Sequence, residues 1–293
     1  MDRLPIDKDT IRDWLTWSFS PSISAIVITF LISILLPISI HLFMYRAKAV
    51  TVVPSFLLVG PSGAGKTTLL TRSEHGTAAS THTSQSPQAV TCRLPSSVTA
   101  RSSQYRAADD PSKEKGRQFE LIDTPGHGKL RHHAFTALES EKRLRGLIFV
   151  LDSAAVASPA GLTEAAMYLH DVLLALQKRH TASKTSKGPA SIPVLIAANK
   201  LDIFTGLPAQ VIKKKLQQEI TNIRTTRAKG LLDSATGSEG EDEEREWLGE
   251  GGEGVFKFKQ LEESEIEVTV LGSIAIGDQA QTDEMLQWVA QQM

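Results

Sequence analysis

The chain contains a single cysteine, Cys92, among its 293 residues. One cysteine excludes an internal disulfide and fits a reducing compartment. No group of cysteine and histidine residues has the spacing of a zinc site. The formal net charge is only -1 at pH 7, so the chain lacks the overall basic field that draws proteins to nucleic acids. We therefore expect no direct, specific nucleic-acid binding.

Charged residues are also missing from one long stretch near the N-terminus. Residues Ile23 to Tyr45 read ISAIVITFLISILLPISIHLFMY and contain no Asp, Glu, Lys or Arg. As an α-helix this stretch would span roughly 34 Å, enough to cross a hydrocarbon core of about 30 Å. The sequence predicts a single transmembrane helix over residues 21–45, with a short N-terminal segment, residues 1–20, on the lumenal side.

Two other interpretations of this stretch are a signal peptide and a buried core helix. A signal peptide would explain the small-residue pattern Ala47-Lys48-Ala49, which resembles a cleavage site. However, the apolar run is longer than a usual signal-peptide core of about 7–15 residues, and the preceding residues are mixed in charge rather than positive. A buried core helix rarely reaches this length. A retained span is therefore favoured over both.

Beyond the span, apolar runs alternate with amphipathic stretches. Near-continuous apolar runs are typical of fully buried parallel strands, and they occur at residues 50–60, 119–126, 146–154, 192–202 and 266–275. Helical patterns fall between them, at about 66–73, 130–143, 161–180, 208–226 and 281–292. This alternation predicts an α/β domain over residues 50–293, with a mostly parallel sheet flanked by helices.

Several polar segments interrupt this pattern and are predicted to be loops. Residues 74–88 are rich in Ser and Thr, residues 100–116 carry mixed charge, and residues 181–191 read as a flexible connector. Residues 233–254 are acidic and rich in glycine. We predict that this last segment is a disordered, solvated insertion without chemistry of its own.

A phosphate-binding loop follows the first apolar run. The eight residues from Gly60 to Thr67 satisfy G-x-x-x-x-G-K-[ST] at every fixed position. The glycines let backbone N–H groups approach phosphate oxygens, and the helix that follows adds its positive dipole end. Lys66 should reach the β- and γ-phosphates, and the Thr67 hydroxyl should ligate Mg²⁺. The predicted nucleotide-binding residues here are Gly60, Pro61, Ser62, Gly63, Ala64, Gly65, Lys66, Thr67 and Thr68.

The purine is indicated by the tetrapeptide Asn199-Lys200-Leu201-Asp202, which ends another apolar run. In α/β folds, ligands bind at the carboxyl ends of the strands. The Asp202 carboxylate can accept hydrogen bonds from guanine N1–H and the exocyclic amine, whereas adenine would leave it without a donor, at a cost of about 1–3 kcal/mol. Asn199 can tie this loop to the phosphate loop, and the Lys200 stem can lie across the ring.

A third motif, Asp123 to Gly126, reads DTPG and also follows an apolar run. Asp123 is placed to hold Mg²⁺, either directly or through water. The Gly126 backbone N–H could meet the γ-phosphate. That contact would make the following segment a switch, ordered by the triphosphate and released after its loss.

The order of these motifs resembles the Ras superfamily of GTPases, and DTPGHGKLR is similar to the Arf/Sar branch. A transmembrane helix just before the first strand resembles one family in particular, the beta subunit of the signal recognition particle receptor. Further segments agree with it, namely FVLDSAA (149–155), IRTTRA (223–228) and FKFKQL (256–261). The resemblance covers roughly residues 20–293.

The resemblance implies roles for three more residues. Thr83 would cap Mg²⁺ in the triphosphate state, with Ser84 and Ser86 as close alternatives. Ser273 would lie in the last guanine-contacting element, although Ile274 and Ala275 depart from the usual pattern, so base contact there would rely on the backbone. His127 occupies the position where many small GTPases place a water-orienting glutamine. It either orients water or is only an exposed histidine in a mobile loop.

The function implied by the resemblance is that of a GTP- and Mg²⁺-binding domain tethered at the endoplasmic reticulum membrane and facing the cytosol. It would bind the receptor's alpha subunit and act indirectly with the signal recognition particle and the ribosome. Lys and Arg flank the span almost evenly, so orientation rests on the need for cytosolic nucleotide. No arginine finger is identifiable, which favours a signalling nucleotide with slow turnover. The alternatives are another membrane-spanning trafficking GTPase, an ATP-consuming subunit, or an anchor whose nucleotide is structural.

Overall fold

The computed structural model describes residues 23–48, 53–95, 97–98, 100–101, 117–141, 143–182, 192–234, 248, 254–276 and 282–293. The chain divides into two compact units, residues 1–51 and 52–293. In the first unit, helix α2 spans Ile23–Lys48. Its described side chains are exposed, and the window Ile26–Phe43 has a mean hydropathy of 2.5. Among the residues with described structure, this is the one helix that is long and apolar enough to cross a bilayer.

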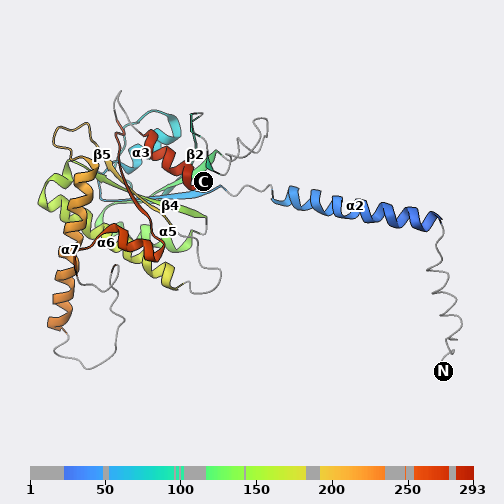
Figure 1. Cartoon of the computed structure of the whole chain (residues 1–293). Coiled ribbons are helices and arrows are strands. Elements are labelled where there is room, and N and C mark those ends of the chain that lie inside the picture. The colour runs from blue at the N-terminus through green and yellow to red at the C-terminus, as the bar shows by residue number, and fades with distance from the viewer. Residues whose placement is uncertain are drawn as a thin grey trace, which may run out of the picture. The chain divides into compact units, whose positions relative to one another are not determined.

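The second unit is a three-layer α/β domain (Figure 1). Its central sheet has the strand order β2-β3-β1-β4-β5-β6. The strands are β1 (Ser55–Val59), β2 (Gln88–Arg93), β3 (Gln118–Asp123), β4 (Leu144–Asp152), β5 (Val194–Asn199) and β6 (Val268–Gly272). The pairs from β3 through β1, β4 and β5 to β6 are parallel, and β2 pairs antiparallel with β3 at the edge. The predicted mostly parallel sheet is therefore confirmed.

Helices cover both faces of this sheet. One apolar cluster packs one face against α5 (His132–Ser140), α6 (Pro159–Ala182) and α7 (Ala209–Ser234). The other cluster packs the opposite face against α3 (Lys66–His75) and α8 (Asp283–Gln292). The short 3-10 segments are η2 (Gly128–Leu130), η3 (Ala155–Ala157) and η5 (Phe258–Ser264). Every residue of β1 and β5 is buried, as expected for central parallel strands covered on both faces.

Strand β2 is absent from the sequence-based prediction, which also placed its first residue, Gln88, in a loop. Within β2 only Cys92 is buried, and the remaining residues are exposed or partly exposed. An edge strand needs no continuous apolar run, because one side and much of its faces meet solvent. Periodicity therefore gave no signal for this strand.

Within the predicted insertion, residues 233–254, the structure describes residues 233, 234, 248 and 254, and the prediction of a solvated segment is wrong at Leu248. Helix α7 continues to Ser234, eight residues beyond the predicted helix end at 226. Leu248 is fully buried and belongs to the cluster under α6 and α7. Residues 235–247 and 249–253 lie outside the described part, as do most of the predicted loops 100–116 and 181–191.

Replacing Leu248 with alanine tests whether the acidic segment contributes to the core. Burial of the leucine side chain predicts a loss of about 2–4 kcal/mol in the free energy of unfolding. The measurement is urea denaturation of the detergent-solubilised chain. Val255→Ala is the matched control, since Val255 is 66% exposed, and its effect should stay within about 0.5 kcal/mol. Equal effects of the two substitutions would contradict the burial of Leu248.

Candidate functional site

The loop between β1 and α3 contains the phosphate-binding motif. Gly60 and Gly65 have φ values of 147° and 94°, a region that side chains rarely adopt. A Cβ at Gly65 would lie 2.3 Å from Asn199 Nδ2. Glycine is therefore required at position 65 for a second reason, because it allows the loop after β5 to approach.

Lys66 begins α3, and its side chain turns back over the loop. Its Nζ donates hydrogen bonds to the carbonyl oxygens of Gly60 at 2.8 Å and Pro61 at 2.9 Å. Burial lowers the pKa of Lys66 from 10.5 to about 8, with Asp123 opposing the decrease and Arg131 adding to it. The ammonium group is thus desolvated and able to gain from a negatively charged ligand.

A cavity of about 390 Å³ lies beside this loop. Its lining comes from the phosphate loop and α3, the segment before β2, the loop after β3, the loop after β5 and the segment after β6. The lining residues are Ser62, Gly63, Gly65, Lys66, Thr67, Thr68, Thr81, His82, Thr83, Ser84, Gly126, Asn199, Lys200, Asp202, Ile203, Ala275 and Ile276. The structure thus brings eleven of the predicted binding residues together, from segments up to about 140 residues apart in the chain.

Asp123 ends β3 beside Thr67, as expected for a magnesium site. The Thr67 hydroxyl donates to Asp123 Oδ2 at 2.7 Å. Oδ1 is buried, with no hydrogen-bond partner among the described residues. Burial raises the pKa of Asp123, while Thr67, Lys66 and Ser84 oppose that rise. A buried carboxylate oxygen in need of a partner, next to a hydroxyl, fits a divalent cation.

The segment before β2 supplies hydroxyl groups to the same end of the cavity. Thr83 lines it, and so does Ser84, the first of the sequence-based alternatives, whose hydroxyl acts to lower the pKa of Asp123. Thr81 also lines the cavity, and its hydroxyl lies 3.1 Å from that of Thr68 in α3. Thr81 was not anticipated, because a polar loop carries no periodicity that would single out one threonine.

The loop after β3 lies directly against the phosphate loop. The Thr124 hydroxyl donates to the Leu58 carbonyl at 2.7 Å. A Cβ added at Gly126 would lie 2.5 Å from the Gly60 carbonyl oxygen and 2.5 Å from Lys66 Nζ. Only glycine allows this segment to pack so closely on the loop, which places position 126 at the phosphate end of the cavity.

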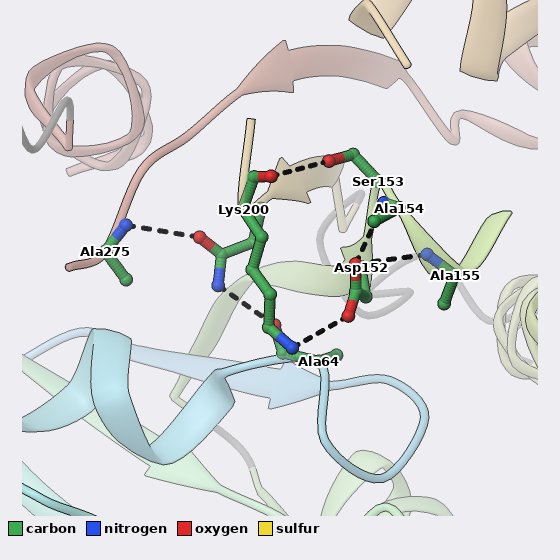
Figure 2. Close-up of polar contacts among 8 residues, drawn as sticks. Ala64, Asp152, Ser153, Ala154, Ala155, Lys200 and Ala275 are labelled. Atoms are coloured by element: carbon green, nitrogen blue, oxygen red, sulfur yellow. Dashed lines mark hydrogen bonds and ion pairs between the residues drawn. The ribbon is translucent and has the colours of Figure 1, made fainter. Parts of the chain in front are cut away.

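Asn199 joins the two halves of the site. Its Nδ2 donates to the Ala64 carbonyl at 2.9 Å, and its Oδ1 accepts the Ala275 N–H at 3.2 Å. Figure 2 shows the phosphate loop at Ala64 and the segment at Ala275 on either side of the loop after β5. This confirms the predicted tie between Asn199 and the phosphate loop.

Lys200 has a positive φ of 63°, which is uncommon for a residue with a side chain. Its Nζ lies 2.7 Å from Asp152 Oδ2, and its carbonyl accepts the Ser153 hydroxyl at 3.1 Å (Figure 2). Asp202 lies exposed on the cavity wall. The loop after β5 is therefore held in place by residues at the end of β4.

Six predicted residues do not line the cavity, namely Gly60, Pro61, Ala64, Asp123, His127 and Ser273. Ser273 is 1% exposed and lies behind it, with its N–H bonded to the Ala198 carbonyl. The segment after β6 reaches the cavity through Ala275 and Ile276 instead. His127 is exposed, and its Nδ1 accepts the Lys129 N–H at the start of η2. Arg131 is bonded to Glu164 at 2.9 Å and packs on the Tyr168 ring.

The fold and the site define a P-loop protein of the Ras-like GTPase class. The family model for the signal recognition particle receptor beta subunit matches residues 51–266, and the chain belongs to that family.

The similar proteins agree with this assignment. The chain is 34% identical over 179 residues to a signal recognition particle receptor subunit beta of Saccharomyces cerevisiae, a match that covers 61% of this chain and 61% of the yeast protein. Two solved structures of the receptor SRb from Chaetomium thermophilum are also similar. The GDP form is 37% identical, covering 82% of this chain and 99% of that one, with a TM-score of 0.59. The complex with GTP and SRX is 36% identical, covering 81% and 99%, with a TM-score of 0.64.

The pKa of Lys66 predicts that diphosphate binding takes up a proton near pH 8. Without ligand the side chain is half protonated at that pH, and a bound phosphate favours the charged form. Binding of GDP at pH 8 should therefore take up about half a proton, and affinity should fall as the pH rises above 8. Calorimetry in buffers of different ionisation enthalpy measures the uptake.

Lys66→Arg is the control for this measurement, because arginine stays charged throughout the range. The variant should show no uptake near pH 8. A wild-type affinity for GDP that is constant from pH 7 to pH 9.5 would contradict the lowered pKa.

Proposed function

We propose that the chain is the membrane-anchored, GTP-binding subunit of a signal recognition particle receptor, with the nucleotide acting as a conformational signal. The observation that carries the proposal is the hydrogen bond from Asn199 Nδ2 to the Ala64 carbonyl. It joins the phosphate loop and the NKLD loop around one cavity, so that Lys66 and Asp202 can act on the same molecule. The related C. thermophilum protein is described with GDP and with GTP.

Guanine selectivity is assigned to Asp202. Its carboxylate lies on the cavity wall and can accept both N1–H and the exocyclic amine of guanine. Adenine presents an acceptor at N1 and has no amine at C2, so it would leave the carboxylate without a donor. The Lys200 stem and Ile203, which also line the cavity, supply apolar surface for the ring.

Magnesium would be held by Thr67 and Asp123, with a hydroxyl from Thr83 or Ser84 added in the triphosphate state. The Thr67–Asp123 pair and the available Asp123 Oδ1 support this assignment. The ion would neutralise phosphate charge that Lys66 alone cannot balance. The Gly126 N–H, held at the phosphate end, would report on the γ-phosphate.

A signalling role is supported by the positions of His127 and Arg131. Neither side chain lines the cavity, and Arg131 is engaged by Glu164 and Tyr168. With neither of these side chains at the cavity wall, hydrolysis by the chain alone would be slow. The bound nucleotide would then act by ordering residues 81–84 and the segment after Gly126.

The partner we propose is the receptor alpha subunit, and through it the signal recognition particle and the ribosome. The solved complex of the C. thermophilum relative with GTP and SRX supports this partner. Helix α2 would anchor the chain in the endoplasmic reticulum membrane as a single span, with residues 1–20 lumenal and residues 50–293 cytosolic. Its length, mean hydropathy and exposed side chains support the anchor.

Changing Asp202 to asparagine should alter the base preference. Asparagine cannot accept two N–H groups from guanine, so GDP affinity should fall about tenfold or more. Its amide can donate to the C2 carbonyl of xanthine, so affinity for xanthosine diphosphate should rise. Competition against fluorescent GDP measures both changes.

Asp283→Asn serves as the matched control, because Asp283 is an exposed aspartate at the start of α8, outside the cavity. It should leave both affinities unchanged. If ATP displaced GTP from the wild-type chain with equal affinity, an ATP-consuming function would replace the proposed one.

The partner is tested by affinity capture from detergent-solubilised membranes. Wild-type chain loaded with GTP should retain the alpha subunit at least fivefold better than chain loaded with GDP. Thr67→Ala should abolish the difference, because it removes the hydroxyl that pairs with Asp123. Capture that is indifferent to nucleotide would favour an anchor with a structural nucleotide, and capture of a different partner would favour another trafficking GTPase.

A further inference from the structure

Asp152 lies in the segment FVLDSAA and outside the three nucleotide-binding motifs, yet it contacts the base-recognition loop. It is the last residue of β4, and its register partner in β5 is Asn199. Because parallel strands end at the same edge of the sheet, this register places the Asp152 carboxylate beside the residue that follows, Lys200. The side chain is 19% exposed and does not line the cavity.

The two carboxylate oxygens of Asp152 have different partners. Oδ1 accepts the backbone N–H groups of Ala154 at 2.9 Å and Ala155 at 3.2 Å, which fixes the turn after β4. Oδ2 accepts the Lys200 ammonium at 2.7 Å. Figure 2 shows the Lys200 chain extending to Asp152, with Ala154 and Ala155 behind the carboxylate. These hydrogen bonds together lower the pKa of Asp152 against the effect of its burial, so the carboxylate is charged at neutral pH.

The backbone of Lys200 is fixed from the same side. The Ser153 N–H donates to the Asn199 carbonyl at 2.9 Å, and its hydroxyl donates to the Lys200 carbonyl at 3.1 Å. A Cβ at Gly206 would lie 2.9 Å from Ser153 Oγ, so the far end of the loop packs on the same serine. Lys200 is therefore held at its backbone by Ser153 and at its side-chain tip by Asp152.

We infer that Asp152 is a positioning residue for guanine recognition, which holds the Lys200 stem along the cavity wall without touching the nucleotide itself. This inference rests on the proposed guanine-nucleotide site. A free lysine has several rotatable bonds and loses their entropy when it lies against a base. The ion pair fixes the lysine beforehand, so less entropy is lost when the base binds. The consequence is slower dissociation of the nucleotide.

The test compares four variants of the full chain in detergent: Asp152→Asn, Lys200→Met, the double variant, and Asp171→Asn as matched control. Asp171 is another ion-paired aspartate, bonded to Arg227 at 2.9 Å and away from the cavity. Asp152→Asn keeps an acceptor for the turn but removes the charge. Lys200→Met keeps an apolar stem but removes the ammonium.

We expect Asp152→Asn to accelerate dissociation of fluorescent GDP about tenfold, the range of a charged hydrogen bond. Lys200→Met should have a similar effect, and the double variant should be no faster than either single one, because both remove the same interaction. The affinity for pyrophosphate, which has no base, measured directly by calorimetry, should be unchanged by Asp152→Asn. The control should release GDP at the wild-type rate.

Several outcomes would overturn the inference. An unchanged GDP dissociation rate in Asp152→Asn would show that Lys200 needs no support. A double variant whose rate increase is the product of the two single increases, or a weaker direct binding of pyrophosphate by Asp152→Asn, would show that Asp152 acts through the general structure of the turn. The wild-type chain reports on the proposed function separately. If it holds no GDP, both proposals fail, and if it holds GDP while Asp152→Asn is indistinguishable from it, only the inference fails.

Discussion

The contact between the Asn199 side chain and the phosphate loop is the constraint on which the rest of the site depends. The amide donates to Ala64 and accepts from Ala275, so one side chain fixes three loops that come from distant parts of the chain. Each partner is a buried backbone group that would cost about 1–3 kcal/mol if left without a hydrogen bond. Gly65 makes this approach sterically possible. The cavity is therefore a product of packing between loops at the carboxyl edge of the sheet.

The features of the fold that the sequence predicted are those with a strong local signal. The buried strands β1, β4 and β5 are continuous apolar runs because helices cover both of their faces. Strand β2 escaped prediction because a single buried residue, Cys92, cannot establish a period. The burial of Leu248 was not predicted, because a single leucine in an acidic, glycine-rich segment forms no apolar periodicity that would indicate a buried position. Its burial is decided by the surface formed by α6 and α7, which only the folded chain creates.

In the site, too, residues with a local sequence signal were predicted, and residues placed by tertiary packing were not. Motif residues such as Lys66, Thr67 and Asn199 were predictable because their chemistry requires fixed spacing along the chain. Ala275 binds Asn199 through its backbone N–H, and the identity of its side chain gives no indication of that contact. Ser273 was predicted for the guanine-contacting segment instead, because its residue type matches the usual pattern of that element. Asp152 did leave a signal, since it is an aspartate directly after an apolar run, as Asp123 is. What the sequence lacked was the register between β4 and β5 that pairs it with Asn199.

The charged groups of the site lie in two places, so that one nucleotide could interact with both. At the phosphate end Lys66 is desolvated and Asp123 is buried, so each of these groups has a perturbed pKa. At the base end Asp152 compensates Lys200, and Asp202 stays exposed on the wall. In the proposed site, a phosphate chain with its cation would supply the countercharges that Lys66 and Asp123 need, while guanine would supply the donors that Asp202 needs. Under the proposed function, binding free energy from both ends would stabilise the same set of loops, and loss of one phosphate would remove that stabilisation only from the loops near residues 81–84 and 126. In the proposed function, this separation between a fixed base end and a responsive phosphate end would allow a slowly hydrolysed nucleotide to act as a signal.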